Sequence, residues 1–230
     1  MAEAERASQN RGKGILRMEF NEKKDWENLD GGEKSFTVKV LNWFHFRKTN
    51  RSWLKEETIT WELIRLLEII PSEFFLRNFL IKIKEKNPPI KKIIDSLINE
   101  LDTVKIESYP YLGLDGTKKK SRSDIGIETK NFGLWIEVKT QIIQEKELEE
   151  QVKKQKISPN FKKDKSRIII ALIPENQDYT QEKITWKETL GVLKESYKSI
   201  KNENNKVLMG YELMLEEIIN RIELRKCYKT

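Results

Sequence analysis

Apolar residues recur with a helical period in the first half of the chain. Segments 55–71, 72–86 and 90–102 each place apolar side chains on one helical face, and in the third segment that stripe contains Ile90, Ile93, Ile94, Leu97, Ile98 and Leu101. We expect three helices here. Thr58 or Thr60 can cap the first, Pro71 stops it, and Ser72 can cap the second.

Beyond residue 103 the pattern becomes that of strands. Segments 103–114, 123–130 and 132–140 favour strands, the last two joined by a short turn at 131–133, and 166–175 contains a continuous apolar run typical of a buried strand. Helical spacing returns at 145–157, 185–200 and 211–224. The order from residue 90 is α-β-β-β-α-β-α, which predicts an α/β fold built on a mixed sheet.

The distribution of polar and apolar residues along the chain suggests three parts. Residues 1–34 are polar and read as a flexible lead. Residues 35–88 form a helical N-terminal region, in which 36–46 fits either a strand or a short buried helix. Residues 89–230 form the α/β core with its closing helices.

Composition narrows the class of partner. Of 230 residues, 37% are hydrophobic and 35% are charged, and the net charge of +7 favours an anionic partner such as nucleic acid or a membrane surface. Ordinary solvated lysines are the alternative reading. No apolar run approaches the length of a membrane span and the first residues are not a signal peptide, so we expect a soluble, cytoplasmic protein.

The chain has a single cysteine, Cys227, and a single histidine, His45. These counts exclude a disulfide within the chain and a cysteine-based zinc site, and they disfavour Ser-His or Cys-His catalysis. A metal ion would therefore be held by carboxylates, which suit Mg²⁺, Mn²⁺ or Ca²⁺.

Three charged residues interrupt the two strands of the expected hairpin. With a turn centred near 131–132, Asp124 would lie opposite Lys139 and Gly126 opposite Glu137. Because side chains alternate along a strand, Asp124, Glu137 and Lys139 share one face, and the aliphatic residues form the other. A surface hairpin with a salt-bridged polar face is the alternative.

Two neighbouring carboxylates repel each other unless a positive group lies between them. A divalent cation satisfies hard oxygen ligands, polarises a phosphoryl oxygen and lowers the pKa of a bound water. Lys139 would then orient or deprotonate that water. The set fits metal-assisted hydrolysis of a phosphodiester.

This arrangement resembles the PD-(D/E)xK nuclease superfamily, with its restriction-endonuclease-like αβββαβ core, over residues 90–175. Asp124 is similar to the family's aspartate, and Glu137-Val138-Lys139 to its E-x-K, whereas Ser123 stands where the family often has proline. The resemblance implies that Asp124, Glu137 and the Val138 carbonyl bind Mg²⁺ or Mn²⁺, and that Lys139 acts on the attacking water.

The resemblance implies two further residues. Gln151 is similar to a glutamine that supports the active site in some such families, with Gln155 replacing the tyrosine four residues later; solvation of both at the helix edge is the alternative. A glutamate from a preceding helix often completes the metal site. Glu56 is the preferred candidate, with Glu57, Glu62 and Glu100 left open, although each alone also fits a solvated helix.

Two basic segments flank the expected site. Lys118, Lys119, Lys120 and Arg122 precede Asp124, while the strand at 166–175 is preceded or opened by Lys162, Lys163, Lys165 and Arg167. Both segments could contact a phosphate backbone, or they could be solvated loops.

The sequence therefore predicts a Mg²⁺-dependent deoxyribonuclease acting in restriction, phage defence, repair or a mobile element. Its partners would be DNA and either a second copy or another subunit. One alternative is a nuclease-fold DNA-binding subunit with a weak or inactive site. Another is a basic α/β interaction protein without a nucleic-acid role.

Overall fold

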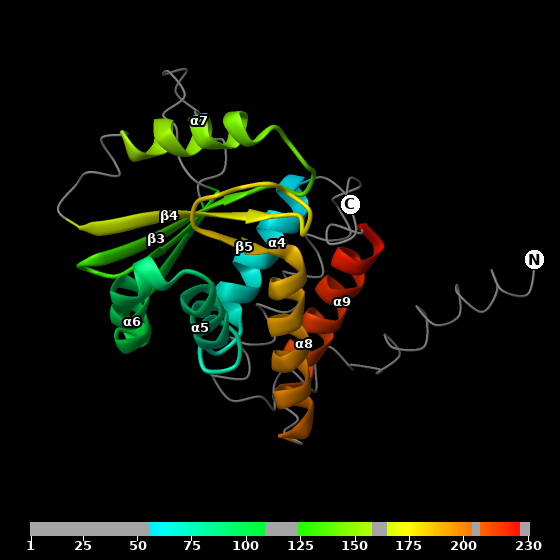
Figure 1. Cartoon of the computed structure of the whole chain (residues 1–230). Coiled ribbons are helices and arrows are strands. Elements are labelled where there is room, and N and C mark those ends of the chain that lie inside the picture. The colour runs from blue at the N-terminus through cyan, green and yellow to red at the C-terminus, as the bar shows by residue number, and fades with distance from the viewer. Residues whose placement is uncertain (1–55, 109–123, 158–164, 204–207, 226–230) are drawn as a thin grey trace, which may run out of the picture. The chain divides into compact units, whose positions relative to one another are not determined.

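The computed structural model describes residues 56–108, 124–157, 165–203 and 208–225, all within the unit formed by residues 43–230. These residues form a five-stranded mixed sheet with helices on both faces (Figure 1). The α/β class expected from the sequence is confirmed. The expected boundary between residues 88 and 89 stays a prediction.

The sheet has the strand order β1-β2-β3-β4-β5. Its strands are β1 (Lys105–Ser108), β2 (Ile125–Glu128), β3 (Phe132–Val138), β4 (Ser166–Ile173) and β5 (Lys183–Thr185). The pairs β1–β2 and β2–β3 are antiparallel, whereas the pairs β3–β4 and β4–β5 are parallel. The helix α7 (Glu145–Lys156) connects β3 to β4, as the parallel pairing of adjacent strands requires.

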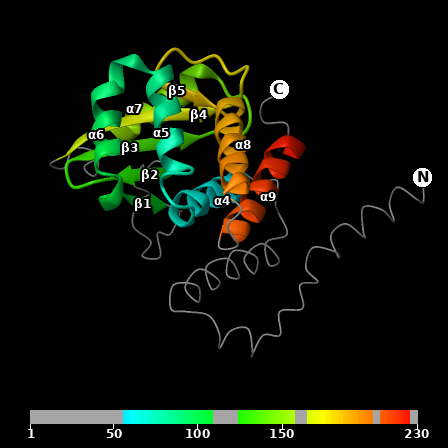
Figure 2. The same ribbon diagram turned by 90° about the horizontal axis from the view of Figure 1, so that it is seen from below.

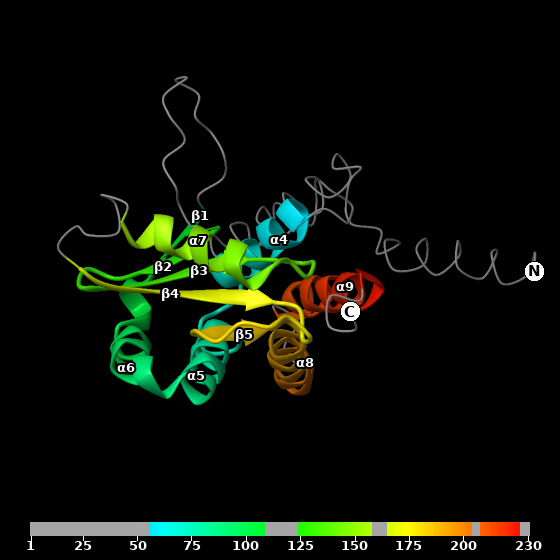
Figure 3. The ribbon, with the colours of Figure 1, turned by 45° about the horizontal axis from the view of Figure 1, so that its top comes forward.

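The helices form two unequal layers. Among the described helices, α7 covers one face, while α5 (Leu76–Lys86), α6 (Lys91–Asn99) and α8 (Trp186–Asn202) cover the other (Figures 1 and 3). Seen from below, α4 (Glu56–Ile69) lies beside β1, and α9 (Met209–Arg225) lies beside α4 and α8 (Figure 2). Short 3-10 turns, η1 (Pro88–Ile90) and η2 (Leu101–Thr103), flank α6.

Alternation in β3 separates two cores. Leu134, Ile136 and Val138 are fully buried on the face covered by α5 and α6. Trp135 points to the other face, where it forms a cluster with residues of α7, β4 and the loop after β4, namely Leu148, Val152, Ile169, Ala171, Ile173 and Tyr179. Burial on both faces explains why β3 and β4 carry nearly continuous apolar runs.

Several helix boundaries differ from the sequence prediction. Helix α4 begins at Glu56, so Thr58 and Thr60 lie inside it rather than at its cap, although it does end before Pro71. Helix α5 begins at Leu76, because residues 72–75 form a turn, so Ser72 is not its N-cap. The start of α8 has a capping box, in which Thr185 and Glu188 exchange side-chain and backbone hydrogen bonds.

Strand β5 was absent from the sequence prediction. It has only three residues, and its outer edge is closed by a side chain: the Lys183 N–H donates to Asn87 Oδ1 at 2.8 Å, and Asn87 Nδ2 donates to the Lys183 carbonyl at 2.9 Å. The buried amide of Asn87 thus replaces a sixth strand, a contact that no local pattern reveals.

Among the described helices, none combines the length and apolar character needed to cross a bilayer.

Candidate active site

The β2–β3 hairpin brings Asp124 and Glu137 next to each other. Ile125 pairs with Ile136 and Gly126 with Trp135, so one further step along the ladder places Asp124 opposite Glu137. The expected pairing of Asp124 with Lys139 is therefore wrong by two residues. The turn lies one residue earlier than predicted, closed by a hydrogen bond from the Thr129 N–H to the Phe132 carbonyl.

The division of faces in this hairpin is nevertheless confirmed. A shift of two residues leaves every side chain on its predicted face, because strands repeat with a period of two. Asp124, Glu137 and Lys139 occupy the alternate positions that belong to the sheet face covered by α7. The aliphatic residues between them belong to the opposite face. Gly126 lies opposite Trp135, so it does not provide the space beside Glu137 that the sequence suggested.

Glu137 is the buried centre of this polar group, with 6% of its surface exposed. Its Oε1 accepts a hydrogen bond from Lys139 Nζ at 2.7 Å, and its Oε2 accepts one from Gln155 Nε2 at 2.5 Å. A buried carboxylate is stable only when paired, and here an ammonium and an amide both serve it.

Asp124 is held against the same strand. Its Oδ2 accepts a hydrogen bond from the Val138 N–H at 2.7 Å, so the carboxylate is tied to the backbone between Glu137 and Lys139. The contact fixes the position of Asp124, which precedes β2 and lies outside its regular ladder. Asp124, Glu137, Val138 and Lys139 thus lie together, as the sequence led us to expect.

The backbone of Lys139 is fixed from two directions. Its N–H donates to the Leu172 carbonyl at 2.8 Å, and its carbonyl accepts from Trp186 Nε1 at 2.8 Å. Trp186 is the first residue of α8 and is fully buried. The backbone at the end of β3 is therefore anchored to β4 and α8, while the lysine side chain is bonded to Glu137.

The two predicted helical glutamines have different surroundings. Gln155 is 3% exposed and contacts Glu137 directly. Gln151 lies one turn earlier, where its Nε2 is 3.4 Å from Glu147 Oε1 and its own carbonyl oxygen is buried without a hydrogen-bond partner among the described residues. Gln155, not Gln151, therefore supports the carboxylate in this structure.

The donor set suits a hard divalent cation. Within the described parts of the chain no three or more His, Cys, Asp or Glu side chains form a metal-binding group. Mg²⁺, however, is ordinarily held by one or two carboxylates and completes its shell with water and substrate phosphates. Asp124 and Glu137 supply two such carboxylates, and the Lys139 contact shows that Glu137 already accommodates a positive group.

Of the four upstream glutamates, only Glu62 and Glu100 have side chains among the described residues. Glu62 is 2% exposed and forms a buried ion pair with Arg221 of α9, to which Glu217 is also bonded, so Glu62 serves the packing of α4 on α9. Glu56 begins α4, but its side chain and that of Glu57 lie outside the described residues. Glu100 follows α6 and is partly exposed.

The basic segments are described only in part. Lys118, Lys119, Lys120, Arg122, Lys162 and Lys163 lie outside the described residues. Lys165 and Arg167 are described, and both pair with Glu128, at 3.0 Å each. The single carboxylate of Glu128 offsets one of these two positive charges, and a role for either residue in contacting a phosphate backbone stays a prediction.

Glu128 is a buried ionic contact that the sequence analysis missed. It is 3% exposed, and its Oε1 also accepts a hydrogen bond from Trp135 Nε1 at 2.6 Å. Burial raises the pKa of Glu128, but the hydrogen bonds from Arg167, Lys165 and Trp135 outweigh burial and lower the pKa overall. A signal existed in the sequence, since Glu128 alternates in step with Asp124.

Tyr179 closes the cluster beneath α7. Burial, together with the negative charges of Glu182, Glu149, Glu137 and Glu145, raises the pKa of Tyr179 to about 12. Its hydroxyl thus remains protonated at neutral pH. This residue, in the loop after β4, carried no sequence signal for proximity to Glu137.

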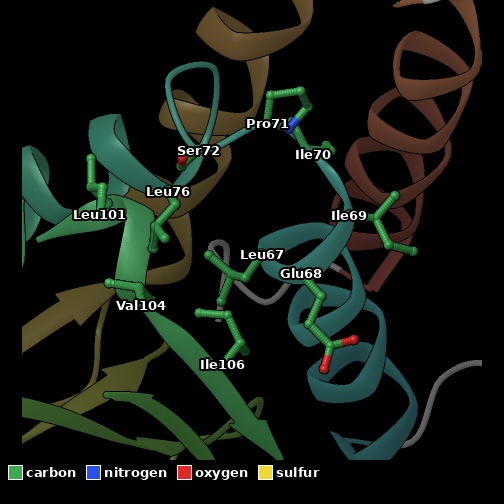
Figure 4. Close-up of a pocket in the computed structure, with 10 residues that line it drawn as sticks. All are labelled: Leu67, Glu68, Ile69, Ile70, Pro71, Ser72, Leu76, Leu101, Val104 and Ile106. Atoms are coloured by element: carbon green, nitrogen blue, oxygen red, sulfur yellow. The ribbon is translucent and has the colours of Figure 1, made fainter. Parts of the chain in front are cut away.

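A separate pocket of about 290 Å³ lies between the end of α4, the start of α5 and β1 (Figure 4). Most of the residues that line it are of apolar type, such as Leu67, Leu76, Val104 and Ile106. The only carboxylate in its lining, Glu68, pairs with Arg65 at 2.7 Å. The pocket lacks the convergent polar groups typical of a catalytic site.

Comparison of the chain with protein-family models, with curated proteins and with solved structures finds no match. Function is therefore inferred from the residues of the site.

Proposed function

We propose that this protein is a Mg²⁺- or Mn²⁺-dependent deoxyribonuclease of the PD-(D/E)xK kind, acting on DNA in the cytoplasm. The observation that carries the proposal is the grouping of Asp124, which directly precedes β2, with Glu137 of β3, to which Lys139 is bonded. The order α6-β1-β2-β3-α7-β4 is compatible with a restriction-endonuclease-like core.

Each residue has a defined task in the proposed site. Asp124 and Glu137 would hold the cation, with the Val138 carbonyl and Glu56 as further protein ligands. When bound, the cation polarises the phosphoryl group and acidifies a coordinated water. Lys139 orients the attacking water, and hydrolysis adds that water across one P–O bond. Gln155 keeps Glu137 in one orientation through its hydrogen bond to Oε2.

The alternative, an inactive DNA-binding subunit, predicts that DNA binding does not require these residues and that no DNA is cleaved. Both readings are compatible with a net charge of +7, which favours association with polyanions. Only the catalytic reading requires both carboxylates and the lysine. A homodimer or a second subunit would supply the second site that double-strand cleavage calls for.

The proposal is tested by incubating the full chain with supercoiled, linear duplex and single-stranded DNA, in Mg²⁺ or Mn²⁺ and in chelator. We expect cleavage that requires the metal and falls about 100-fold or more in Glu137→Gln and in Lys139→Met. Glu150→Gln and Lys153→Met, which change exposed charges on α7, are matched controls and should cleave normally.

Two results would count against the proposal. Cleavage that survives both active-site substitutions would place the chemistry elsewhere. Metal-insensitive DNA binding without cleavage of any substrate would favour the inactive binding subunit.

A further inference from the structure

The Lys139–Glu137 contact has a consequence for cation binding, if the proposed function holds. The two side chains are 13% and 8% exposed, and the ammonium lies 2.7 Å from Oε1. The other oxygen of Glu137 is bonded to Gln155. A cation that binds Glu137 must therefore displace one of these two donors or share an oxygen with it.

The two donors differ in how easily they move. Gln155 is buried on α7, whose Leu148 and Val152 pack into the cluster around Trp135. Lys139 follows the last residue of β3, and its positive head is attached to a flexible four-carbon stem. Displacing the ammonium also relieves its repulsion with the incoming cation, whereas displacing the amide brings no such gain.

We propose that the Lys139 ammonium is a resident counter-ion that competes with the divalent cation for Oε1 of Glu137, while Gln155 retains Oε2. The metal-free protein thereby avoids an unpaired buried carboxylate. Binding of the cation releases the ammonium from Glu137 at the position where the attacking water is to be oriented. Lys139 thus opposes the binding of the cation on which its own catalytic role depends.

The competition predicts an unusual effect of substitution. Lys139→Met keeps the apolar stem and removes the charge, so Mn²⁺ should bind about tenfold more tightly than to the wild type in calorimetric titration of the full chain. Lys153→Met is the matched control. Lys153 is 67% exposed and pairs with Glu149 on the outer side of α7, so its loss should change Mn²⁺ affinity less than about twofold.

A second measurement uses the wild type alone and does not depend on the folding of a variant. Acylation of lysines by an N-hydroxysuccinimide ester, read by mass spectrometry, should modify Lys139 at least about threefold faster when Mn²⁺ is present, because the freed amine is no longer bonded to Glu137. Lys153 is the internal reference, whose rate should not change.

The outcomes separate this inference from the function on which it rests. Mn²⁺ affinity that is equal or weaker in Lys139→Met, or Lys139 acylation that is unchanged or slowed by Mn²⁺, overturns the competition and leaves the nuclease proposal standing. Absence of Mn²⁺ binding in both wild type and Lys139→Met overturns the metal site and the competition together.

Discussion

At the scale of single residues, Glu137 is defined by its two partners. Both of its oxygens receive hydrogen bonds, from a lysine two positions along the strand and from a glutamine on a helix. Removing one partner of a buried charge lowers the free energy of unfolding by more than the contact itself contributes to it. The reason is that the remaining group is still buried and has lost the hydrogen bond that offset its desolvation. Stability and catalysis are therefore linked at this carboxylate.

Gln155→Leu tests that link. The variant leaves Glu137 Oε2 buried without its amide donor, so the free energy of unfolding should fall by about 1.5–3 kcal/mol. Gln151→Leu is the control one turn away, where the lost carbonyl oxygen has no hydrogen-bond partner among the described residues, and the stability of this variant should be unchanged or higher. Urea unfolding followed by circular dichroism measures both. Equal losses in the two variants would contradict a specific role for Gln155.

The sequence could assign the face of each charged residue but not all of its contacts. Alternation alone placed Asp124, Glu137 and Lys139 together, since it depends only on the period of the strand. Which glutamine of α7 reaches Glu137 depends on how the helix crosses the sheet, and this is not encoded in helical spacing. Likewise, Glu62 was an open ligand candidate until its buried partner appeared 159 positions away.

At the scale of elements, the hairpin is anchored at two ends. Near its turn, Glu128 connects β2 to the start of β4 through Lys165 and Arg167. Gly133 lies opposite Glu128, and a Cβ at this glycine would be 2.8 Å from the Glu128 carboxylate, so the missing side chain makes room for the ion pair. At its other end, the hairpin carries Asp124 and Glu137.

Glu128→Gln tests the anchor through pH. The pKa of Glu128 is lowered in the folded protein, so the ionised carboxylate stabilises the fold above the unfolded value near 4.5, and this stability is lost as the pH falls through the lower folded pKa. The free energy of unfolding of the variant should be lower than that of the wild type by about 3 kcal/mol at pH 7. This difference between the two proteins should become smaller below about pH 4.5.

Urea unfolding of both proteins between pH 7 and pH 3 provides the measurement. Glu150→Gln changes an exposed residue of α7, and its difference in stability from the wild type should not depend on pH. A difference between wild type and Glu128→Gln that stays constant with pH would show that the carboxylate is not stabilised by its cationic partners.

Elements with strong periodicity were predictable, and those defined by tertiary contacts were not. The order of elements from α6 to β4 could be predicted because the apolar residues of each segment recur with the spacing of a helix or of a strand. The predicted register of the hairpin differs from the observed one by two residues. The turn begins at Thr129, whereas the sequence signal for a turn lies at Asn131–Gly133. Strand β5 depends on Asn87, 96 positions earlier.

At the scale of the whole described fold, the site lies on the α7 face of the sheet, while α5, α6 and α8 cover the other face and α4 and α9 lie beside them (Figures 1 and 2). The net charge of +7 predicts attraction to a polyanion but not which surface meets it. Within the described residues, Lys165 and Arg167 share the single carboxylate of Glu128, so this group of three keeps a net charge of +1. Sequence composition cannot distinguish a paired cation from a spare one.

The most direct test of the central claim is the rate of DNA cleavage by wild type and by Asp124→Asn, measured with excess protein on the best DNA substrate in Mg²⁺. Asp124→Asn keeps an oxygen that can accept the hydrogen bond from the Val138 N–H but removes the negative charge. We predict a loss of about 100-fold or more. Equal rates for the two proteins, or no metal-dependent cleavage by the wild type on any form of DNA, would contradict the account.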